Sequence, residues 1–224
     1  MVKAVIFDLD DTLYREKDFV EGAFKYVCKY LSMQYELNFG KLYEDINDIL
    51  KKHGRGSIFN ILCKKYNIAE DISTLVNIYR NSLPQIDLYE DAANFFKKYS
   101  GKYSFGIITD GKASVQWNKI GLLNLKKYVD GIIVTDDYGK KYWKPNSFVY
   151  LKMAQYFECR PEECLYIGDN PNKDFIGARA IGMNTIRIIR KSGDHMNTFL
   201  DSSKEADFNI NSMDKLQNII ENRM

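Results

Sequence analysis

The hydrophobic positions of this chain follow two patterns, which are short continuous runs and longer stretches with helical spacing. Apolar, β-branched runs that end in Gly, Asp or Thr are typical of strands buried on both faces of a sheet. Such runs lie at residues 3–8, 104–110, 130–136, 164–169 and 184–189, and a candidate edge strand lies at 207–211. Helical segments are expected at 146–157, at 173–182 and near 213–222. This alternation of strands and helices predicts an α/β fold with a parallel sheet and right-handed crossovers.

The stretch between the first two predicted strands is too long for one crossover. It reads as helical throughout, since Val20, Phe24, Val27 and Leu31 keep a spacing of three or four and similar spacing recurs as far as Tyr79. Four amphipathic helices can bury their apolar stripes against one another. We therefore predict a core domain from residues 1–15 and 84–224 and an inserted helical domain from residues 16–83.

The composition makes several classes of binding partner improbable. The chain has 224 residues, 45% of them hydrophobic, with a formal net charge of +2 and no block of like charge. Neither nucleic acid nor a membrane surface is therefore expected as a partner. No signal peptide is visible, and the four cysteines lack CxxC pairs, which favours reduced thiols in a cytoplasmic protein. The composition leaves open whether the protein is a monomer or a homodimer.

The titratable residues narrow the chemistry further. With only two histidines, His53 and His195, a His-centred triad or a multi-His zinc site is improbable. Three carboxylates, Asp8, Asp10 and Asp11, instead follow the apolar run at residues 5–7. Acids this close raise one another's pKa unless a positive charge lies among them.

Further polar residues follow the other predicted strands. The residues at strand ends are Asp8 and Asp10, Thr109 and Asp110, Lys144, and Asp169 and Asp174. Ligands of open parallel sheets bind beyond the carboxyl ends of the strands. Carboxylates without imidazoles suit Mg²⁺, which would offset their repulsion and neutralise a phosphate oxygen. One ionised Asp can then attack phosphorus, and a second can protonate the leaving oxygen.

The order of these residues resembles a known family. D-x-D-x-T at 8–12, T-D-G at 109–111, K-P at 144–145 and G-D-x-x-x-x-D at 168–174 are similar to the four motifs of the haloacid dehalogenase-like (HAD) superfamily of phosphohydrolases. The similarity extends to the longer stretches LYEDAANFFKKYSGKYSFGIITDG and GDNPNKDFIGARAIGM. It implies a Rossmann-like parallel sheet with an inserted helical-bundle cap between the first two motifs.

The resemblance implies a role for each of the acids in the first and last motifs, and for Thr12 of the first motif. Asp8 matches the nucleophile that forms an aspartyl-phosphate, and Asp10 matches the general acid and base. Mg²⁺ would be held by Asp8, the backbone carbonyl of Asp10 and Asp169. Thr12 matches a residue that steadies the first loop, and Asp174 one that orients the lysine or a metal-bound water.

Substrate-binding residues are implied in the same way. Thr109 matches the hydroxyl that binds the transferring phosphoryl group, helped by the next backbone N–H, and Asp110 and Gly111 complete that motif. Lys144 matches the lysine that holds nucleophile and phosphate together. Many relatives have Asn where this chain has Asp110, and its carboxylate would disfavour phosphate binding unless it points away.

Three more charged residues are less constrained by the motifs. Arg55, in the Gly-flanked loop HGRGS at 53–57, would suit a substrate carboxylate or a second phosphate, or is a solvated loop charge. Lys112 could line the entrance beside the second motif. Asp11 is expected to face solvent without a role.

These inferences predict a Mg²⁺-dependent phosphatase acting on a small soluble phosphate ester, such as a sugar phosphate, an acidic-sugar phosphate or a nucleotide. A dehalogenase of the same fold is one alternative, although displacing a halide does not need the acid at Asp10. A phosphosugar mutase is another. A non-catalytic phosphoacceptor module is a third, and the position of Asp8 and the helical insertion count against it.

Overall fold

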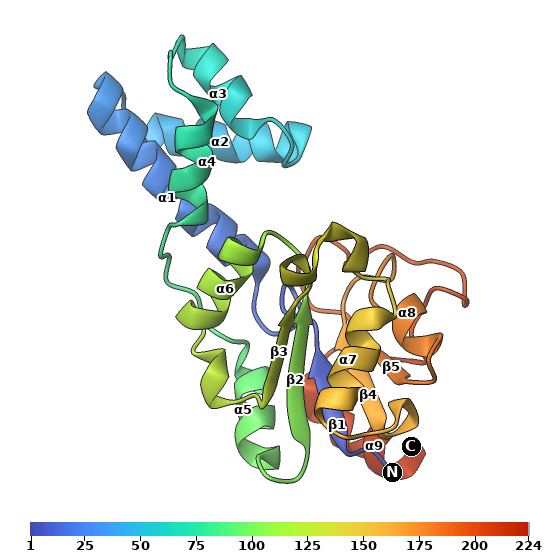
Figure 1. Cartoon of the computed structure of the whole chain (residues 1–224). Coiled ribbons are helices and arrows are strands. Elements are labelled where there is room, and N and C mark those ends of the chain that lie inside the picture. The colour runs from blue at the N-terminus through green and yellow to red at the C-terminus, as the bar shows by residue number, and fades with distance from the viewer. Residues whose placement is uncertain (224) are drawn as a thin grey trace. The chain divides into compact units, whose positions relative to one another are not determined.

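The sheet of the computed structural model confirms the predicted α/β fold class. The structure describes residues 1–223. Six parallel strands form one sheet in the order β3-β2-β1-β4-β5-β6, coloured from blue to red along the chain in Figure 1. The strands are β1 Ala4–Phe7, β2 Ser104–Thr109, β3 Gly131–Val134, β4 Cys164–Gly168, β5 Asn184–Ile188 and β6 Phe208–Ile210. The strand order reverses between β1 and β4, which is where ligands of such sheets bind.

Helices cover both faces of this sheet, which explains why its strands are apolar at successive positions. They are α5 Glu90–Tyr99, α6 Ala113–Leu122, α7 Phe148–Tyr156, α8 Ile176–Arg179 and α9 Leu216–Arg223. On one face, Ala4 and Ile6 pack with Val149 and Met153 of α7. Phe7 of β1 instead contacts the aromatic rings of α5. Alternate side chains of β1 thus enter different parts of the core.

The chain divides into two compact units, one formed by residues 1–16 and 86–224 and the other by residues 17–85. The helices of the second unit are α1 Glu16–Tyr35, α2 Phe39–His53, α3 Ile58–Tyr66 and α4 Ile72–Arg80. Their shared core contains the predicted stripe of Val20, Phe24, Val27 and Leu31.

Local signals explain where these four helices begin and end. The side chains of Asn38 and Asp71 accept hydrogen bonds from backbone N–H groups in the first turns of α2 and α4. Gly54 ends α2 with a φ of 68°, a conformation that residues with a Cβ rarely adopt. The HGRGS segment therefore contains the end of α2 and an exposed loop that carries Arg55.

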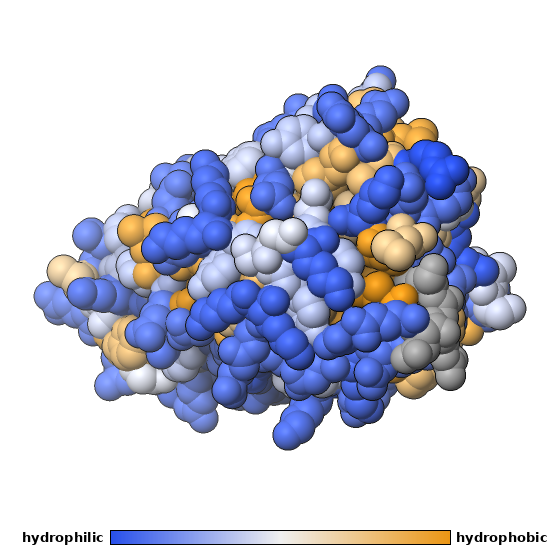
Figure 2. Space-filling view, turned by 90° about the horizontal axis from the view of Figure 1, so that it is seen from below, coloured by the Kyte–Doolittle hydropathy of each residue, from blue (hydrophilic) through white to orange (hydrophobic). Residues whose placement is uncertain are grey.

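Surface features agree with the composition. The face seen in Figure 2 is largely hydrophilic, with hydrophobic side chains in small groups between polar ones. Along residues 1–223, no helix combines the length and the apolar character that crossing a bilayer requires.

Candidate active site

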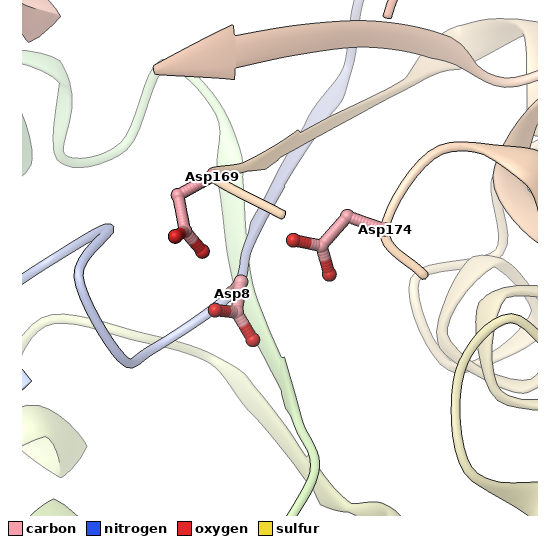
Figure 3. Close-up of side chains that lie close together, drawn as sticks. All are labelled: Asp8, Asp169 and Asp174. Carbon is pink, nitrogen blue, oxygen red and sulfur yellow. The ribbon is translucent and has the colours of Figure 1, made fainter. Parts of the chain in front are cut away.

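Three acidic side chains from two neighbouring strand ends converge at the reversal point of the sheet. Asp8 directly follows β1, and Asp169 directly follows β4. Asp174 lies in the turn after Asp169, and its carboxylate returns towards β4. The candidate ligand atoms of the three residues all lie within 4.8 Å of one another, and Figure 3 shows the carboxylates turned towards a common space. All three residues are buried.

A glycine makes this convergence possible. A Cβ on Gly168 would lie 2.5 Å from an oxygen of Asp174, closer than real Cβ contacts come. The backbone of β4 can therefore pass directly beside the Asp174 carboxylate only because residue 168 has no side chain. The backbone N–H of Asn170 donates to the same carboxylate oxygen at 2.9 Å, which fixes the acid in place.

The Lys144 ammonium lies between two of the acids. Its Nζ donates to Asp8 Oδ1 at 2.5 Å, to Asp174 Oδ1 at 2.7 Å and to the hydroxyl of Tyr166 at 2.9 Å. Burial alone would lower the pKa of Lys144, but Asp174 and Asp8 outweigh burial and raise it well above its ordinary value. Lys144 is therefore a permanent positive charge beside Asp8.

The acids differ in how readily they ionise. Burial raises the pKa of Asp8 to about 7, although Lys144 opposes the shift. The pKa of Asp169 is raised well above its ordinary value by burial and by the charges of Asp174 and Asp8. Burial also acts on Asp174, but Lys144 and Lys173 outweigh it and lower its pKa. A single lysine at the centre thus does not suffice to ionise all three acids.

This imbalance fits a divalent cation. Within residues 1–223, no group donates a hydrogen bond to the Asp169 carboxylate, although this residue is only 3% exposed. A buried carboxylate without a donor is costly unless it is protonated or bound to a metal. Oxygen ligands without nitrogen or sulfur match the preference of Mg²⁺. Asp8 and Asp169 are thus placed to hold such an ion, while Asp174 is engaged by Lys144.

The Asp10 side chain lies outside this cluster of acids. Its Oδ1 accepts hydrogen bonds from Tyr14 at 2.6 Å and from Lys119 at 2.7 Å, and its Oδ2 accepts one from Gln116 at 3.0 Å. Only the backbone of Asp10 would then be available to a metal ion near Asp8. The Asp10 carboxylate is held by these three side chains and not by the groups around Asp8, so it can have a role other than metal binding.

The Gln116 amide joins Asp10 to Thr109. Its Nε2 also donates to Thr109 Oγ1 at 2.5 Å, so that one amide group supports both polar side chains. Because Thr109 Oγ1 accepts this bond, its own hydrogen remains to be donated elsewhere. Sequence reasoning missed Gln116 and Lys119, whose only signal was their spacing on one face of α6.

The Asp110 carboxylate is held by hydrogen bonds within the protein. Its Oδ1 accepts hydrogen bonds from the Thr135 hydroxyl at 2.7 Å and from the backbone N–H of Lys144 at 3.1 Å. Its Oδ2 lies 3.4 Å from Nζ of Lys173. Asp110, whose role the sequence left open, thus fixes the backbone of Lys144.

Tyr166 and Lys173 also belong to this site and were not anticipated.

The expectation for Asp11 was wrong. The residue is buried rather than facing solvent, and its carboxylate accepts hydrogen bonds from the backbone N–H groups of Glu16 and Asp194, each at 3.0 Å. Burial raises its pKa to about 6. The segment around Asp194 covers this acid, and its approach from a distant part of the chain could not be read from local sequence. Asp11 therefore ties the first loop to the segment after β5.

The remaining residues of the predicted site have other surroundings. Thr12 is fully buried, and its backbone carbonyl accepts a hydrogen bond from Arg190 at 2.8 Å. Gly111 has a φ of 127°. Nζ of Lys112 lies 3.4 Å from Oδ2 of Asp136. Arg55 belongs to the separate unit of residues 17–85, so its part in substrate binding stays a prediction.

Comparisons with known proteins identify the family to which this chain belongs. Residues 5–188 match the family described as haloacid dehalogenase-like hydrolase. The chain is 29% identical to a glyceraldehyde 3-phosphate phosphatase of Methanocaldococcus jannaschii, with 99% of this chain and 98% of that protein covered. Among solved structures, a HAD phosphatase from Thermococcus onnurineus has a TM-score of 0.63 and 24% identity, with 98% of both chains covered. A 2-haloacid dehalogenase from Pseudomonas syringae has a TM-score of 0.68 and 20% identity, with 99% of both chains covered.

Proposed function

Because the chain belongs to the haloacid dehalogenase-like hydrolase family, we propose that it is a Mg²⁺-dependent phosphatase that hydrolyses a small sugar phosphate through an aspartyl-phosphate. The predicted enzyme class, a hydrolase of phosphoric monoesters, agrees with the curated relative of almost equal length, which is named as a phosphatase. The observation that carries the proposal is the position of Asp8, buried at the reversal point of the sheet and paired with Lys144.

In the first step, an Asp8 oxygen attacks phosphorus, and the bond from phosphorus to the ester oxygen breaks. Protonated Asp10 gives its proton to that oxygen, which leaves as an alcohol. In the second step, water attacks the phosphorus of the aspartyl-phosphate, Asp10 takes the proton of the water, and Asp8 is released together with inorganic phosphate.

The contacts of the two aspartates suit these roles. Lys144 stabilises the ionised form of Asp8, which is the form that attacks. Tyr14, Gln116 and Lys119 all donate hydrogen bonds to Asp10, and these contacts hold its carboxyl group in one place two residues after the nucleophile. Mg²⁺ bound by Asp8, Asp169 and the Asp10 carbonyl would neutralise charge on the phosphoryl oxygens.

The Asp10 contacts also separate this proposal from a dehalogenase of the same fold. Expelling a halide needs no proton donor, whereas expelling an alkoxide does. Three side chains hold Asp10 two residues after the nucleophile, so the chain maintains a group that a dehalogenase would not use. A phosphosugar mutase would keep the phosphoryl group on sugar, and prompt release of inorganic phosphate distinguishes the two.

The substrate proposal rests on the relatives. Glyceraldehyde 3-phosphate is the first compound to test, because the Methanocaldococcus jannaschii protein is named for it. Larger sugar phosphates, acidic-sugar phosphates and nucleotides are the comparison set. We assign the choice among them to the unit of residues 17–85, which would act as a cap, since the residues around Asp8 handle only the phosphoryl group.

The test is release of inorganic phosphate from this set of esters. We expect activity with Mg²⁺, none in chelator, and recovery with Mg²⁺ but not with Ca²⁺, whose looser coordination would misplace Asp8. The variant Asp8→Asn should fold and have only background activity. Full turnover in chelator, or in Asp8→Asn, would exclude the proposed metal or nucleophile.

A further inference from the structure

The hydrogen-bond donors of Lys144 are fully used within the protein. Its ammonium carries three hydrogens, and these go to Asp8, Asp174 and Tyr166 at 2.5–2.9 Å. Its side chain is 0% exposed. Lys144 therefore supplies positive charge beside Asp8, and its three hydrogens are already directed to groups of the protein.

A second ammonium lies at the same site with hydrogens to spare. Nζ of Lys173 lies 3.4 Å from Asp110 Oδ2, longer than the usual charge-assisted hydrogen bond. Its side chain is 30% exposed, so an entering anion can reach it. Burial and Lys144 would lower the pKa of Lys173, but Asp8, Asp174 and Asp110 raise it, and the side chain is charged.

A formal count of charges at the site also favours a role for this lysine. Asp8, Asp110, Asp169 and Asp174 contribute four negative charges when ionised, whereas Lys144 and a divalent cation contribute three positive ones. The site without Lys173 would carry a net negative charge and repel a phosphate ester. With Lys173 it is neutral, and one of its cations is partly exposed.

We propose that Lys173 binds the phosphoryl group of the substrate directly, through the ammonium hydrogens that Asp110 does not use. This inference rests on the proposed function and adds a substrate-binding residue to it. Lys144 would then position the nucleophile, while Lys173 would hold the incoming anion together with the hydroxyl hydrogen of Thr109.

The test compares Lys173→Met with the wild-type enzyme. We expect KM for the ester and the inhibition constant for inorganic phosphate both to rise about ten- to hundred-fold, as for loss of a hydrogen bond to a charged group. Lys173→Arg should recover most of the binding because it keeps the charge. Values within twofold of wild type for Lys173→Met would overturn the proposal.

A matched control removes the same charge elsewhere. Lys97 is exposed on α5. This helix leads into the amino end of β2, whereas Asp8 lies at the carboxyl end of β1. Lys97→Met should leave KM and the phosphate inhibition constant unchanged. An equal rise in Lys97→Met and Lys173→Met would show a general effect of net charge and overturn the assignment.

A double variant separates contact with substrate from shielding of Asp110. Asp110→Asn keeps an oxygen that can accept from Thr135 and from the backbone of Lys144, but it removes the carboxylate charge. If Lys173 touches the phosphoryl group, Lys173→Met with Asp110→Asn should still bind phosphate weakly. Recovery of wild-type KM in the double variant would show that Lys173 only shields Asp110. Absence of Mg²⁺-dependent phosphate release from the wild-type enzyme would instead refute the proposed function itself.

Discussion

The pairing of Lys144 with Asp174 can be tested through stability, independently of any substrate. The perturbations are Lys144→Met, which removes the ammonium from a side chain of similar length, and Asp174→Asn, which removes the charge at nearly constant shape. Both side chains are fully buried, and Nζ lies 2.7 Å from Oδ1. Lys144→Met leaves Asp174 buried without this ammonium, whereas Asp174→Asn leaves Lys144 paired with Asp8 alone.

The expected magnitude follows from that burial. Removing one partner of a buried ion pair costs about 3–5 kcal/mol, because the remaining charge has lost its solvent and its partner. The double variant lacks both charges, so it should cost less than the sum of the singles by about 1–3 kcal/mol. A loss of about 3 kcal/mol corresponds to a Tm lower by about 6–12 °C in a protein of this size.

The assay is urea unfolding in chelator, followed by tryptophan fluorescence. The chain has two tryptophans, Trp117 and Trp143, and both lie in the α/β unit. The signal therefore reports on the unit that contains the pair. Chelator is needed because a cation bound to the folded state would stabilise it by mass action.

Additivity would refute the reasoning. If the free energies lost in Lys144→Met and Asp174→Asn sum to that of the double variant, the two side chains do not interact in solution. The matched cycle combines Asp174→Asn with Lys97→Met, which removes an exposed ammonium, and this pair should be additive.

Three further predictions follow from the same structure. Asp10→Asn should slow turnover severely and should slow it least for esters with good leaving groups, which need little protonation; an equal loss across a series of aryl and alkyl phosphates would assign Asp10 a structural role. Arg55→Ala should lower kcat/KM about ten- to hundred-fold for a natural substrate with a second anionic group and leave an aryl phosphate unchanged, and equal changes for both would show that Arg55 does not select substrate. In the helical unit, burial would raise the pKa of Asp45, but hydrogen bonds from Lys65, Tyr66 and Lys41 hold it at about 2, below the ordinary 3.8. Asp45 thus stabilises the folded state above pH 4 and loses this effect as the pH falls towards 2, a contribution of about 1–2 kcal/mol after allowing for the exposed lysines. Urea titrations followed by circular dichroism should therefore show a smaller loss of stability between pH 5 and pH 2.5 in Asp45→Asn than in wild type.

The sequence by itself determined the local features of this protein. The apolar runs predicted five of the six strands because strands covered on both faces must be hydrophobic at successive positions. The stripe from Val20 to Leu31 predicted a helix because its spacing matches the helical repeat. Asp8 and Asp169 could be assigned to one edge of the sheet because the carboxyl ends of parallel strands meet there.

Only the tertiary structure decided which distant groups touch. Lys119 and Gln116 reach Asp10 across more than one hundred residues of sequence, and Lys144 reaches Asp8 across 136. Asp11 is buried, and the backbone N–H of Asp194 donates a hydrogen bond to it. From the local sequence alone, Asp11 was expected to face solvent. Such contacts depend on strand order and on loop positions, which hydrophobic periodicity does not encode. The burial and partners of each acid, and hence its pKa, therefore became known only from the folded chain.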